Sequence, residues 1–377
     1  MKMKITLIGT LPPIVGISDT CYEQVNSISK HVDINFIDFK SLYPRLLFPG
    51  KITDQSFTIK ANENVNIERL ISWYNPLSWI KAGLKPKTDV IHFHWWTFYL
   101  FPIFFTIILI LKIRGKKIIC ETHNILGHET SLIDVFLTKI IFKLPDCFMV
   151  HTEDSKKKLM EWFDIKKEIS IIPLGLPAFY LNKKISKTQA REYLNLKSKD
   201  RVLLFFGNIR EYKGLKSLIK AFSIVTKQAN DVKLIIAGHP WVDWQEYQNL
   251  INELKLEKHI QKYLKFVPTS EVKYFFSACD LVILPYKSFD AQSGPGRISL
   301  LFHKPLIVTN VGGLPDLVDN KDCIIEPDDY ENMAKSIIKV LKDKKTLDKL
   351  SKHSEELYKK FSWSDIAKQT VKIYKKY

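Results

Sequence analysis

The sequence predicts an α/β protein that consists of two doubly wound domains. Short apolar runs alternate along the chain with segments in which apolar side chains recur at helical spacing. Some of these runs, such as residues 202–206 and 232–237, are almost continuously apolar, which is typical of parallel strands covered on both faces. The chain of 377 residues is also too long for one hydrophobic core and suits two.

The predicted elements fall into two series separated by turn-forming residues near 176–185. We expect strands in the first series at residues 4–9, 32–37, 90–94, 117–122, 147–151 and 171–173. Strands of the second series are expected at residues 202–207, 232–238, 263–267, 281–285 and 306–309. Helices are expected at residues 215–226, 244–254, 271–278, 330–341 and 346–361. Ligands of such sheets bind beyond the carboxyl ends of the strands, so the cleft between the two domains is the expected active site.

The net charge of +17 is compatible with nucleic acid, anionic lipid or a phosphorylated substrate as a partner, or with a general bias toward lysine. The lysines are not interleaved with aromatic residues, so we expect no nucleic-acid partner. The five cysteines are scattered and lie in apolar runs, which indicates buried thiols in a reducing compartment, the cytoplasm. No two of them have zinc-ligand spacing.

One apolar segment, residues 95–111, is followed by Lys112, Arg114, Lys116 and Lys117. Its length is at the short limit for a membrane span, and predicted strands flank it on both sides. We therefore expect a helix between two strands of one sheet, with an outer face that belongs either to the core or to a lipid interface. The first residues read as a strand and not as a signal peptide. The expected location is cytoplasmic, peripheral on the inner face of the cell membrane.

Two cations follow the strand at residues 202–207, in the turn Phe205-Phe-Gly-Asn-Ile-Arg-Glu-Tyr-Lys-Gly-Leu215. Gly207 and Gly214 allow sharp turns, and a helix begins at the end of the segment. Arg210 and Lys213 would stand near a helix N-terminus, which itself attracts anions. A guanidinium and an ammonium in this position can clamp a diphosphate, although two solvated surface cations would give the same pattern.

Two more loops follow strands in the same half of the chain. In Pro285-Tyr-Lys-Ser-Phe-Asp-Ala-Gln-Ser-Gly-Pro-Gly-Arg-Ile298, Ser293 and Gly294 precede a helix expected to start near Pro295. This is either an anion site or an ordinary helix capped by Ser293. The third loop, Val311-Gly-Gly-Leu-Pro-Asp316, is rich in glycine. Three such loops after three strands favour a phosphate-binding domain over chance.

Taken in order, the motifs of the chain resemble glycosyltransferase family 4, also called group 1. The resemblance is carried by residues 206–214, Gly238, Asp280-Leu-Val-Ile-Leu-Pro285 and His303-Lys-Pro-Leu-Ile-Val-Thr-Asn-Val-Gly-Gly-Leu-Pro-Asp316. In the first half it is carried by Gly9, Gly16-Ile-Ser18, Asp89-Val-Ile-His-Phe-His94, Glu121-Thr-His-Asn124 and Ile172-Pro-Leu-Gly175. The resemblance implies the GT-B fold, with two Rossmann-like domains facing across a cleft. Residues 1–180 would bind the acceptor, residues 181–361 would bind the nucleotide-sugar donor, and a last helix at 362–377 would return to the first domain.

The resemblance also implies roles for particular residues. Arg210 and Lys213 match the pair that holds the donor diphosphate and offsets the charge of the leaving nucleotide. His123 matches a histidine that reaches the donor sugar, and a buried structural histidine is the alternative. Further donor-binding positions are Gly16 in a closing loop, Gly207, Gln292, Ser293 and Gly294.

One feature departs from the family pattern, which has two glutamates eight positions apart in the loop before a large helix. Alignment on His303-Lys-Pro305 places Asp290 at the first position and Ile298 at the second. Asp290 can still touch the donor sugar, whereas an isoleucine cannot hold the donor ribose. The loop reads Asp-Ala-Gln-Ser-Gly, which resembles a variant branch. The family norm of retained anomeric configuration is therefore an expectation to be measured.

No metal and no cofactor are expected. His92 and His94 alternate on one predicted strand, but the sequence offers no evident third ligand. His128 and Glu129 are either acceptor-side groups or polar residues of a surface loop.

The predicted function is transfer of a hexosyl group from a UDP- or GDP-sugar to a glycan or lipid-linked acceptor, in polysaccharide or glycolipid biosynthesis. The alternatives are another GT-B enzyme, such as a phosphorylase or epimerase, and a basic non-enzymatic protein that binds membrane or nucleic acid.

Overall fold

The computed structural model describes residues 2–42, 53–55, 59–126, 131–181, 185–289 and 293–377. The chain forms two compact units. Unit 1 consists of Met1–Gly175 and Phe361–Tyr377, and unit 2 consists of Leu176–Lys360. The expected domain boundaries were at residues 180 and 361.

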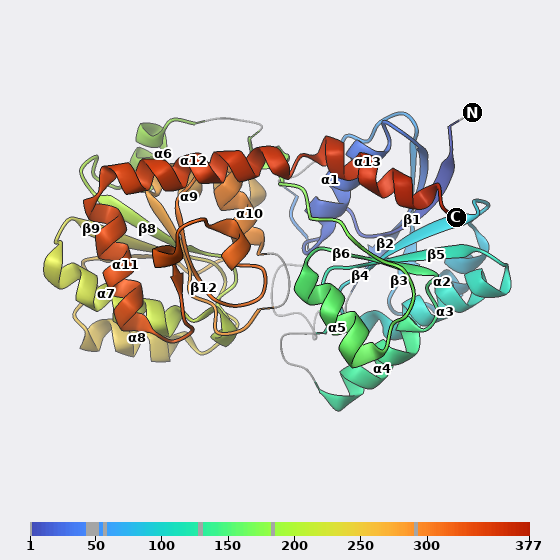
Figure 1. Ribbon diagram of the computed structural model, residues 1–377, viewed down its shortest axis with the longest axis horizontal. Coiled ribbons are helices and arrows are strands. Elements are labelled where there is room, and N and C mark those ends of the chain that lie inside the picture. Colours follow the sequence, from blue (N-terminus) through green and yellow to red (C-terminus); the bar gives the residue numbers. More distant parts are fainter. Residues whose placement is uncertain (1, 43–52, 56–58, 127–130, 182–184, 290–292) are drawn as a thin grey trace. The chain divides into compact units, whose positions relative to one another are not determined.

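Unit 1 is built around a seven-stranded parallel sheet with the strand order β3-β2-β1-β4-β5-β6-β7 (Figure 1). Its strands are β1 Lys4–Gly9, β2 Asp33–Ser41, β3 Val65–Ser72, β4 Val90–Trp95, β5 Lys117–Thr122, β6 Cys147–Val150 and β7 Ile169–Ile171. Its helices are α1 Ser18–Ile28, α2 Pro76–Leu84, η2 Phe98–Leu100, α3 Phe101–Ile113, α4 Leu132–Phe142, α5 Glu153–Phe163 and α13 Trp363–Tyr374.

Helices cover both faces of this sheet, which explains why its strands are apolar on both sides. One core lies between the sheet and α1 with α13, and it includes Val25 and Ile366. The other lies between the sheet and α2–α5, and it includes Phe104 and Phe142. Figure 1 shows these two helix layers on opposite sides of the sheet. Ser27 Oγ donates to the Trp363 carbonyl over 2.7 Å, so a polar contact also joins α13 to α1.

The apolar segment at residues 95–111 forms the end of β4, η2 and most of α3. Because β4 and β5 pair directly, the prediction of a helix between two strands of one sheet is confirmed. One side of α3 is buried, at Ile103, Phe104, Ile107, Ile108 and Leu111, while Leu109 and Ile113 on its other side are exposed. Within the described ranges, every helix is too short or too polar to cross a bilayer.

Unit 2 contains a six-stranded parallel sheet with the strand order β10-β9-β8-β11-β12-β13 (Figure 1). Its strands are β8 Arg201–Phe206, β9 Val232–Ala237, β10 Ile260–Tyr263, β11 Leu281–Leu284, β12 Leu306–Thr309 and β13 Ile324–Ile325. The α-helices are α6 Lys187–Tyr193, α7 Leu215–Gln228, α8 Trp244–Glu253, α9 Thr269–Ala278, α10 Gly294–Leu301, α11 Tyr330–Lys342 and α12 Lys344–Lys360. Short 3₁₀ turns are η3 Ala178–Leu181, η4 Glu211–Lys213, η5 Pro315–Leu317 and η6 Lys321–Cys323.

The core of unit 2 lies mainly between the sheet and α7, α8 and α11, with Phe222 and Ile337 at its centre. On the opposite face α9 packs against β8, where the Phe206 ring lies 5.0 Å from that of Phe276.

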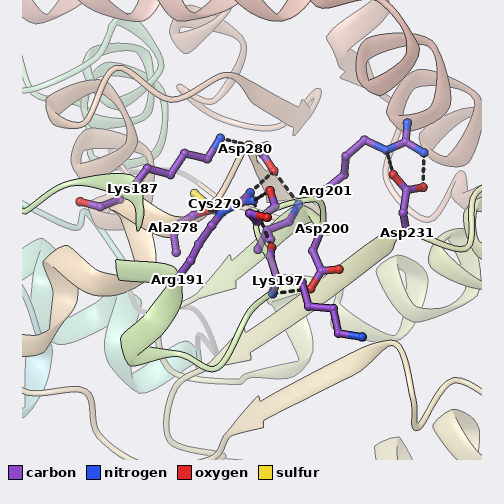
Figure 2. Close-up of polar contacts among 12 residues, drawn as sticks. Lys187, Arg191, Lys197, Asp200, Arg201, Asp231, Ala278, Cys279 and Asp280 are labelled. Atoms are coloured by element: carbon purple, nitrogen blue, oxygen red, sulfur yellow. Dashed lines mark hydrogen bonds and ion pairs between the residues drawn. The ribbon is translucent and has the colours of Figure 1, made fainter. Parts of the chain in front are cut away.

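Ion pairs and capped backbone groups hold the amino ends of the unit 2 strands together (Figure 2). Asp280, directly before β11, accepts from Arg191 Nη2 over 2.9 Å, from the Val202 amide over 2.7 Å, and from Lys187. Arg191 also donates to the carbonyls of Ala278, Lys197 and Ser198. At the start of β8 and β9, Arg201 forms a bidentate pair with Asp231. We call Asp280, Arg191 and Lys187 the Asp280 network.

The sequence did not predict β3 or β13, and it placed β10 at residues 263–267 instead of Ile260–Tyr263. Strand β3 reads Val-Asn-Ile-Glu-Arg-Leu-Ile-Ser and lies at an edge of its sheet, so it lacks the continuous apolar run by which the central strands were recognised. Strand β13 has only two residues and owes its strand form to pairing with β12.

Candidate functional site

Each sheet has one point at which the strand order reverses. In unit 2 the chain runs from β8 outward to β9 and β10, and it then returns to β11 on the other side of β8. In unit 1 the same reversal separates β1 and β4. Such points leave a crevice at the carboxyl ends of the two strands, where α/β proteins bind their ligands. Gly16 follows β1, Arg210 and Lys213 follow β8, and Ser293 follows β11, whereas His123 follows β5, the neighbour of β4.

After β8 the chain turns at Gly207, whose φ of +101° favours glycine. A Cβ atom on Gly207 would lie 2.8 Å from Lys213 Nζ. The ammonium of Lys213 therefore stands directly over the turn, and a larger residue at 207 would displace it.

Lys213 is buried, and its Nζ lies 5.5 Å from the centroid of the Tyr286 ring. No hydrogen bond or ion pair joins this ammonium to another residue among those that the structure describes. Burial, and after it the charge of Arg210, lowers the pKa of Lys213 to about 8. A buried cation without a carboxylate partner is costly, and a bound anion would compensate it.

Arg210 is half-buried and lies against aromatic rings, with its Cζ 4.7 Å from the centroid of Trp241 and 5.9 Å from that of Tyr212. These rings support the guanidinium as cation–π partners. Arg210 and Lys213 flank the same turn, and the effect of Arg210 on the Lys213 pKa reflects their proximity. The structure thus brings together the two cations that were predicted to form a clamp.

The loops after β8 and β11 are in direct contact. Gly214, with a φ of +67°, approaches so closely that a Cβ there would lie 1.8 Å from the Pro285 carbonyl oxygen. The Tyr286 hydroxyl and Ser293 Oγ are hydrogen-bonded over 3.1 Å. This contact places the start of α10 beside the Lys213 turn.

Ser293 caps α10, since its Oγ accepts from the Gly296 amide over 3.2 Å. The helix begins at Gly294, one residue before the predicted start. A Cβ on Gly294 would meet nothing within 4 Å, so packing inside unit 2 does not require glycine there. Ile298 is buried in α10 and offers no polar group. Asp290 and Gln292 lie outside the described residues.

In unit 1, Gly9 at the end of β1 faces β4. A Cβ on Gly9 would lie 2.8 Å from Cδ2 of His94, so the histidine ring fills the space that glycine leaves. Gly16, in the turn before α1, has a φ of +123°, and a Cβ there would meet nothing within 4 Å. Its conformation therefore favours glycine, although steric contact does not require it.

His123 is buried and belongs to a cluster of imidazoles around one carboxylate, Glu121. His123 Nε2 lies 2.9 Å from His94 Nδ1 and 3.8 Å from Glu121 Oε1. His92 Nε2 lies 3.0 Å from Glu121 Oε2, and His151 Nε2 lies 3.6 Å from Glu121 Oε1. We call His92, His94, Glu121, His123 and His151 the Glu121 cluster.

The sequence prediction missed Glu121 and His151 as members of this cluster. Glu121 pairs in register with His94 across β4 and β5, and His151 follows β6. The sequence showed no evident third ligand beside His92 and His94. The structure provides one, because Glu121 Oε2 lies 3.0 Å from His92 Nε2 and 4.0 Å from His94 Nδ1. Three groups of described residues bring potential metal-ligand atoms within 4.8 Å of one another, and they are Cys21-His94-His123, His92-His94-Glu121 and Glu121-His123-His151. His128 and Glu129 lie outside the described residues.

A pocket of about 760 Å³ in unit 1 is lined by residues that include Lys4, Asn35, Asp89 and Tyr377. It includes the amino ends of β1 and β4, and none of the predicted site residues lines it. We therefore place the candidate site at the carboxyl ends of the strands and not in this pocket.

Residues 186–357, which make up most of unit 2, match the family model described as "Glycosyl transferases group 1". Among curated proteins, an uncharacterized glycosyltransferase of Methanocaldococcus jannaschii is 27% identical over 195 residues, which are 50% of this chain and 48% of that protein. The match thus spans about half the length of that relative. A lipopolysaccharide 1,2-N-acetylglucosaminetransferase of Salmonella typhimurium is 23% identical over 94% of this chain and 87% of its own.

The two units have the GT-B fold. Among solved structures, HepE of Anabaena in complex with UDP and glucose aligns with a TM-score of 0.77 over 100% of both chains, at 16% sequence identity. At this identity the likeness establishes the fold alone. The predicted fold class, two Rossmann-like α/β sheets of the GT-B type, is confirmed.

Proposed function

We propose that the protein is an active glycosyltransferase that uses a nucleotide-sugar donor and that unit 2 binds the donor diphosphate. The observation that carries this proposal is Lys213, a buried ammonium at the β8–β11 switch point with no anionic partner among the described residues. Arg210 supplies a second positive charge at the same turn. The two cations offset the negative charge that develops on the nucleotide as it leaves the sugar.

The remaining roles are proposed on the family resemblance. Gly207 and Gly294 let the backbone approach the phosphates, and Ser293 fixes the start of α10 beside them. Asp290 and Gln292 contact the donor sugar and phosphates, Gly16 belongs to a closing loop, and His123 is the unit 1 residue that acts on the transferred sugar. Ile298 cannot hold a ribose, because it is apolar and buried. The ribose contact of this variant loop therefore comes from another residue.

UDP is the proposed nucleotide, and GDP is the alternative. The support for UDP is the similarity to HepE, which was solved with UDP and with UDP-glucose. Retention of configuration is proposed from the family, and an NMR spectrum of the product distinguishes it from inversion.

The proposed acceptor is a glycan or a lipid-linked glycan at a membrane surface. In unit 1 thirteen large apolar side chains of the described residues are exposed, all on or next to α2–α5: Trp73, Tyr74, Leu77, Ile80, Leu84, Tyr99, Leu109, Ile113, Leu132, Ile133, Phe136, Met160 and Trp162. In unit 2 Tyr193 is the one such residue among those described. The same layer carries Lys81, Lys139, Lys156 and Lys157. Apolar side chains flanked by lysines favour the surface of an anionic bilayer.

Replacement of Lys213 tests the donor site. We expect Lys213→Ala to lower kcat on the order of 10²- to 10³-fold, because one preorganised charge is lost from the transition state. It should also remove the thermal stabilisation that millimolar UDP gives the wild-type protein. Lys216→Ala is the matched control, since Lys216 lies one turn further on and is paired with Glu246 over 2.7 Å at the surface. Normal turnover by the Lys213 variant would refute the assignment.

Liposome binding tests the membrane part separately. The protein should sediment with vesicles that contain anionic lipid at low salt and should be released by high salt. Replacing Leu132, Ile133 and Phe136 of α4 by serine should abolish sedimentation, whereas Tyr193→Ser in unit 2 should not. Failure of the wild-type protein to sediment at low salt would refute this part and leave the donor site standing.

A further inference from the structure

Glu121 is a carboxylate that is buried among histidines and not among cations. No lysine or arginine of the described residues pairs with it. The titratable and polar groups that face it come from five elements: Cys21 and Gln24 of α1, His92 and His94 of β4, His123 after β5, His151 after β6, and Tyr374 of α13. An isolated buried anion is costly, so its charge must be offset within this group.

On one side of Glu121 the direction of the hydrogen bonds can be assigned. Burial raises the pKa of Tyr374 well above its usual range, so the hydroxyl keeps its proton. Tyr374 is then the donor to His92 Nδ1, 2.7 Å away. With Nδ1 as the acceptor, the ring proton of His92 is on Nε2, which lies 3.0 Å from Glu121 Oε2. Gln24 Nε2 donates to the same oxygen over 2.7 Å.

On the other side the carboxylate faces the pair formed by His94 and His123. Their nitrogens lie 2.9 Å apart, so one ring donates a proton to the other. Glu121 Oε2 lies 4.0 Å from His94 Nδ1, and Glu121 Oε1 lies 3.8 Å from His123 Nε2. The negative charge therefore acts on both atoms that share this proton. The position of this proton, on His94 Nδ1 or on His123 Nε2, is the variable that Glu121 can set.

We propose that Glu121 is a positioning residue, which fixes the tautomer and ring orientation of His94 and, through His94, those of His123. The consequence for sugar transfer rests on the proposed function, in which His123 acts on the transferred sugar. A histidine can donate or accept at its second nitrogen, and the proton at the first nitrogen decides which. Glu121 thus determines which kind of hydrogen bond His123 can offer to a substrate, although it touches none itself.

A divalent metal ion is the other way to offset the charge of Glu121, since the same side chains form the groups of potential ligands described above. The contact between His94 and His123 favours hydrogen bonding over a shared metal, because His94 Nδ1 and His123 Nε2 are already 2.9 Å apart. Stoichiometric zinc in the purified protein, lost on Glu121→Gln, would overturn the proposal in favour of a metal site.

Ring ¹⁵N spectra of the histidines test the proposal without any enzyme assay. Glu121→Gln keeps the size of the side chain and removes its charge, and we expect it to change the ¹⁵N shifts of His94 and His123 toward a different tautomer. Asp38→Asn is the matched control. Asp38 is also a buried carboxylate of the unit 1 sheet, but it is held by Arg69 and by the amides of Leu11 and Phe39. Unchanged His123 shifts in Glu121→Gln would overturn the proposal, whether or not the protein transfers sugar.

Kinetics separate positioning from a merely structural role. Loss of the carboxylate that orients a histidine in a catalytic triad costs up to about 10⁴ in kcat. Because Glu121 acts through a second histidine, we expect Glu121→Gln to lower kcat on the order of 10- to 100-fold, with KM for the donor nearly unchanged and the pH profile shifted. Glu121→Asp should recover part of the loss. An equal fall in kcat for Asp38→Asn would show a general effect of buried charge and overturn the proposal.

If Glu121→Gln fails to fold, His94→Gln takes its place, because it removes the imidazole that links Glu121 to His123 and keeps the carboxylate of Glu121. The proposal then requires that His94→Gln change the His123 shifts and lower kcat as well. A His94 variant with wild-type His123 shifts would overturn it.

Discussion

The Asp280 network of unit 2 and the Glu121 cluster of unit 1 are each built on one carboxylate, half-buried in Asp280 and fully buried in Glu121, but they balance its charge differently. Asp280 has two cationic partners, Arg191 and Lys187, and a backbone amide. Glu121 has four imidazoles and an amide side chain, and no permanent cation among the described residues. The first set contains a guanidinium and an ammonium, whereas the second contains imidazoles, between which protons can be redistributed.

The two groups also lie at opposite ends of the strands of their sheets. Asp280 directly precedes β11, at the amino ends of the strands, where Arg201 and Asp231 pair as well. Glu121 lies near the carboxyl end of β5, and Lys213 follows the carboxyl end of β8. Charges at the amino ends of the unit 2 strands are thus compensated by the protein itself. At the carboxyl ends, where α/β sheets generally bind ligands, a charge that the protein leaves uncompensated is available to a ligand or to a proton.

The largest expected effect is on the free energy of unfolding, through the Asp280 network at the amino ends of the unit 2 strands. Arg191→Met should lower the free energy of unfolding by about 3–5 kcal/mol, because Asp280 loses its best partner and three backbone carbonyls lose a donor. Urea unfolding followed by tryptophan fluorescence measures this. Asp231→Asn is the control, since its pair with Arg201 is more exposed and should cost about 1 kcal/mol or less. Similar losses in both variants would remove the distinction between a buried network and a surface pair.

A smaller effect is expected on the affinity for UDP, through Lys213 at the carboxyl end of β8. The pKa of Lys213 is lowered to about 8, so the free protein loses this charge as the pH rises through 8. A diphosphate binds the protonated form, and UDP affinity should fall about tenfold between pH 7 and pH 9. Isothermal titration calorimetry at both pH values measures it. Lys213→Ala should bind weakly at both, whereas Lys216→Ala should retain the pH dependence.

The same shift has a consequence for the free protein with the opposite sign. Above about pH 8 the unfolded chain keeps a proton that folded Lys213 has lost, so the contribution of this group to stability rises with pH up to about 10.5.

UDP affinity that is flat from pH 7 to pH 9 would mean that Lys213 is not the cation that binds the diphosphate.

The sequence predicted the central strands and the turn that carries Arg210 and Lys213, because both are local patterns. The strands that hold Val202 and Val232 are nearly continuous apolar runs, and Arg210 and Lys213 lie within four residues of each other between two glycines. The Glu121 cluster is not local. Its members come from three strands and the ends that follow them, and the pairing of β4 with β5 and of β5 with β6 brings them together. A single sequence shows histidines in separate motifs but does not show which of them share a face and a carboxylate.

Unit 1 is assembled from two separated pieces of the chain, and the whole of unit 2 is inserted between them. Helix α13 covers part of one face of the unit 1 sheet and brings Tyr374 to His92. During synthesis unit 2 can therefore fold as soon as it has left the ribosome, whereas unit 1 must wait for its last helix with that face uncovered. A chaperone that acts on the nascent chain would therefore meet this uncovered face in residues 1–175, and the hydrogen bond from Tyr374 to His92 would form only when α13 packs.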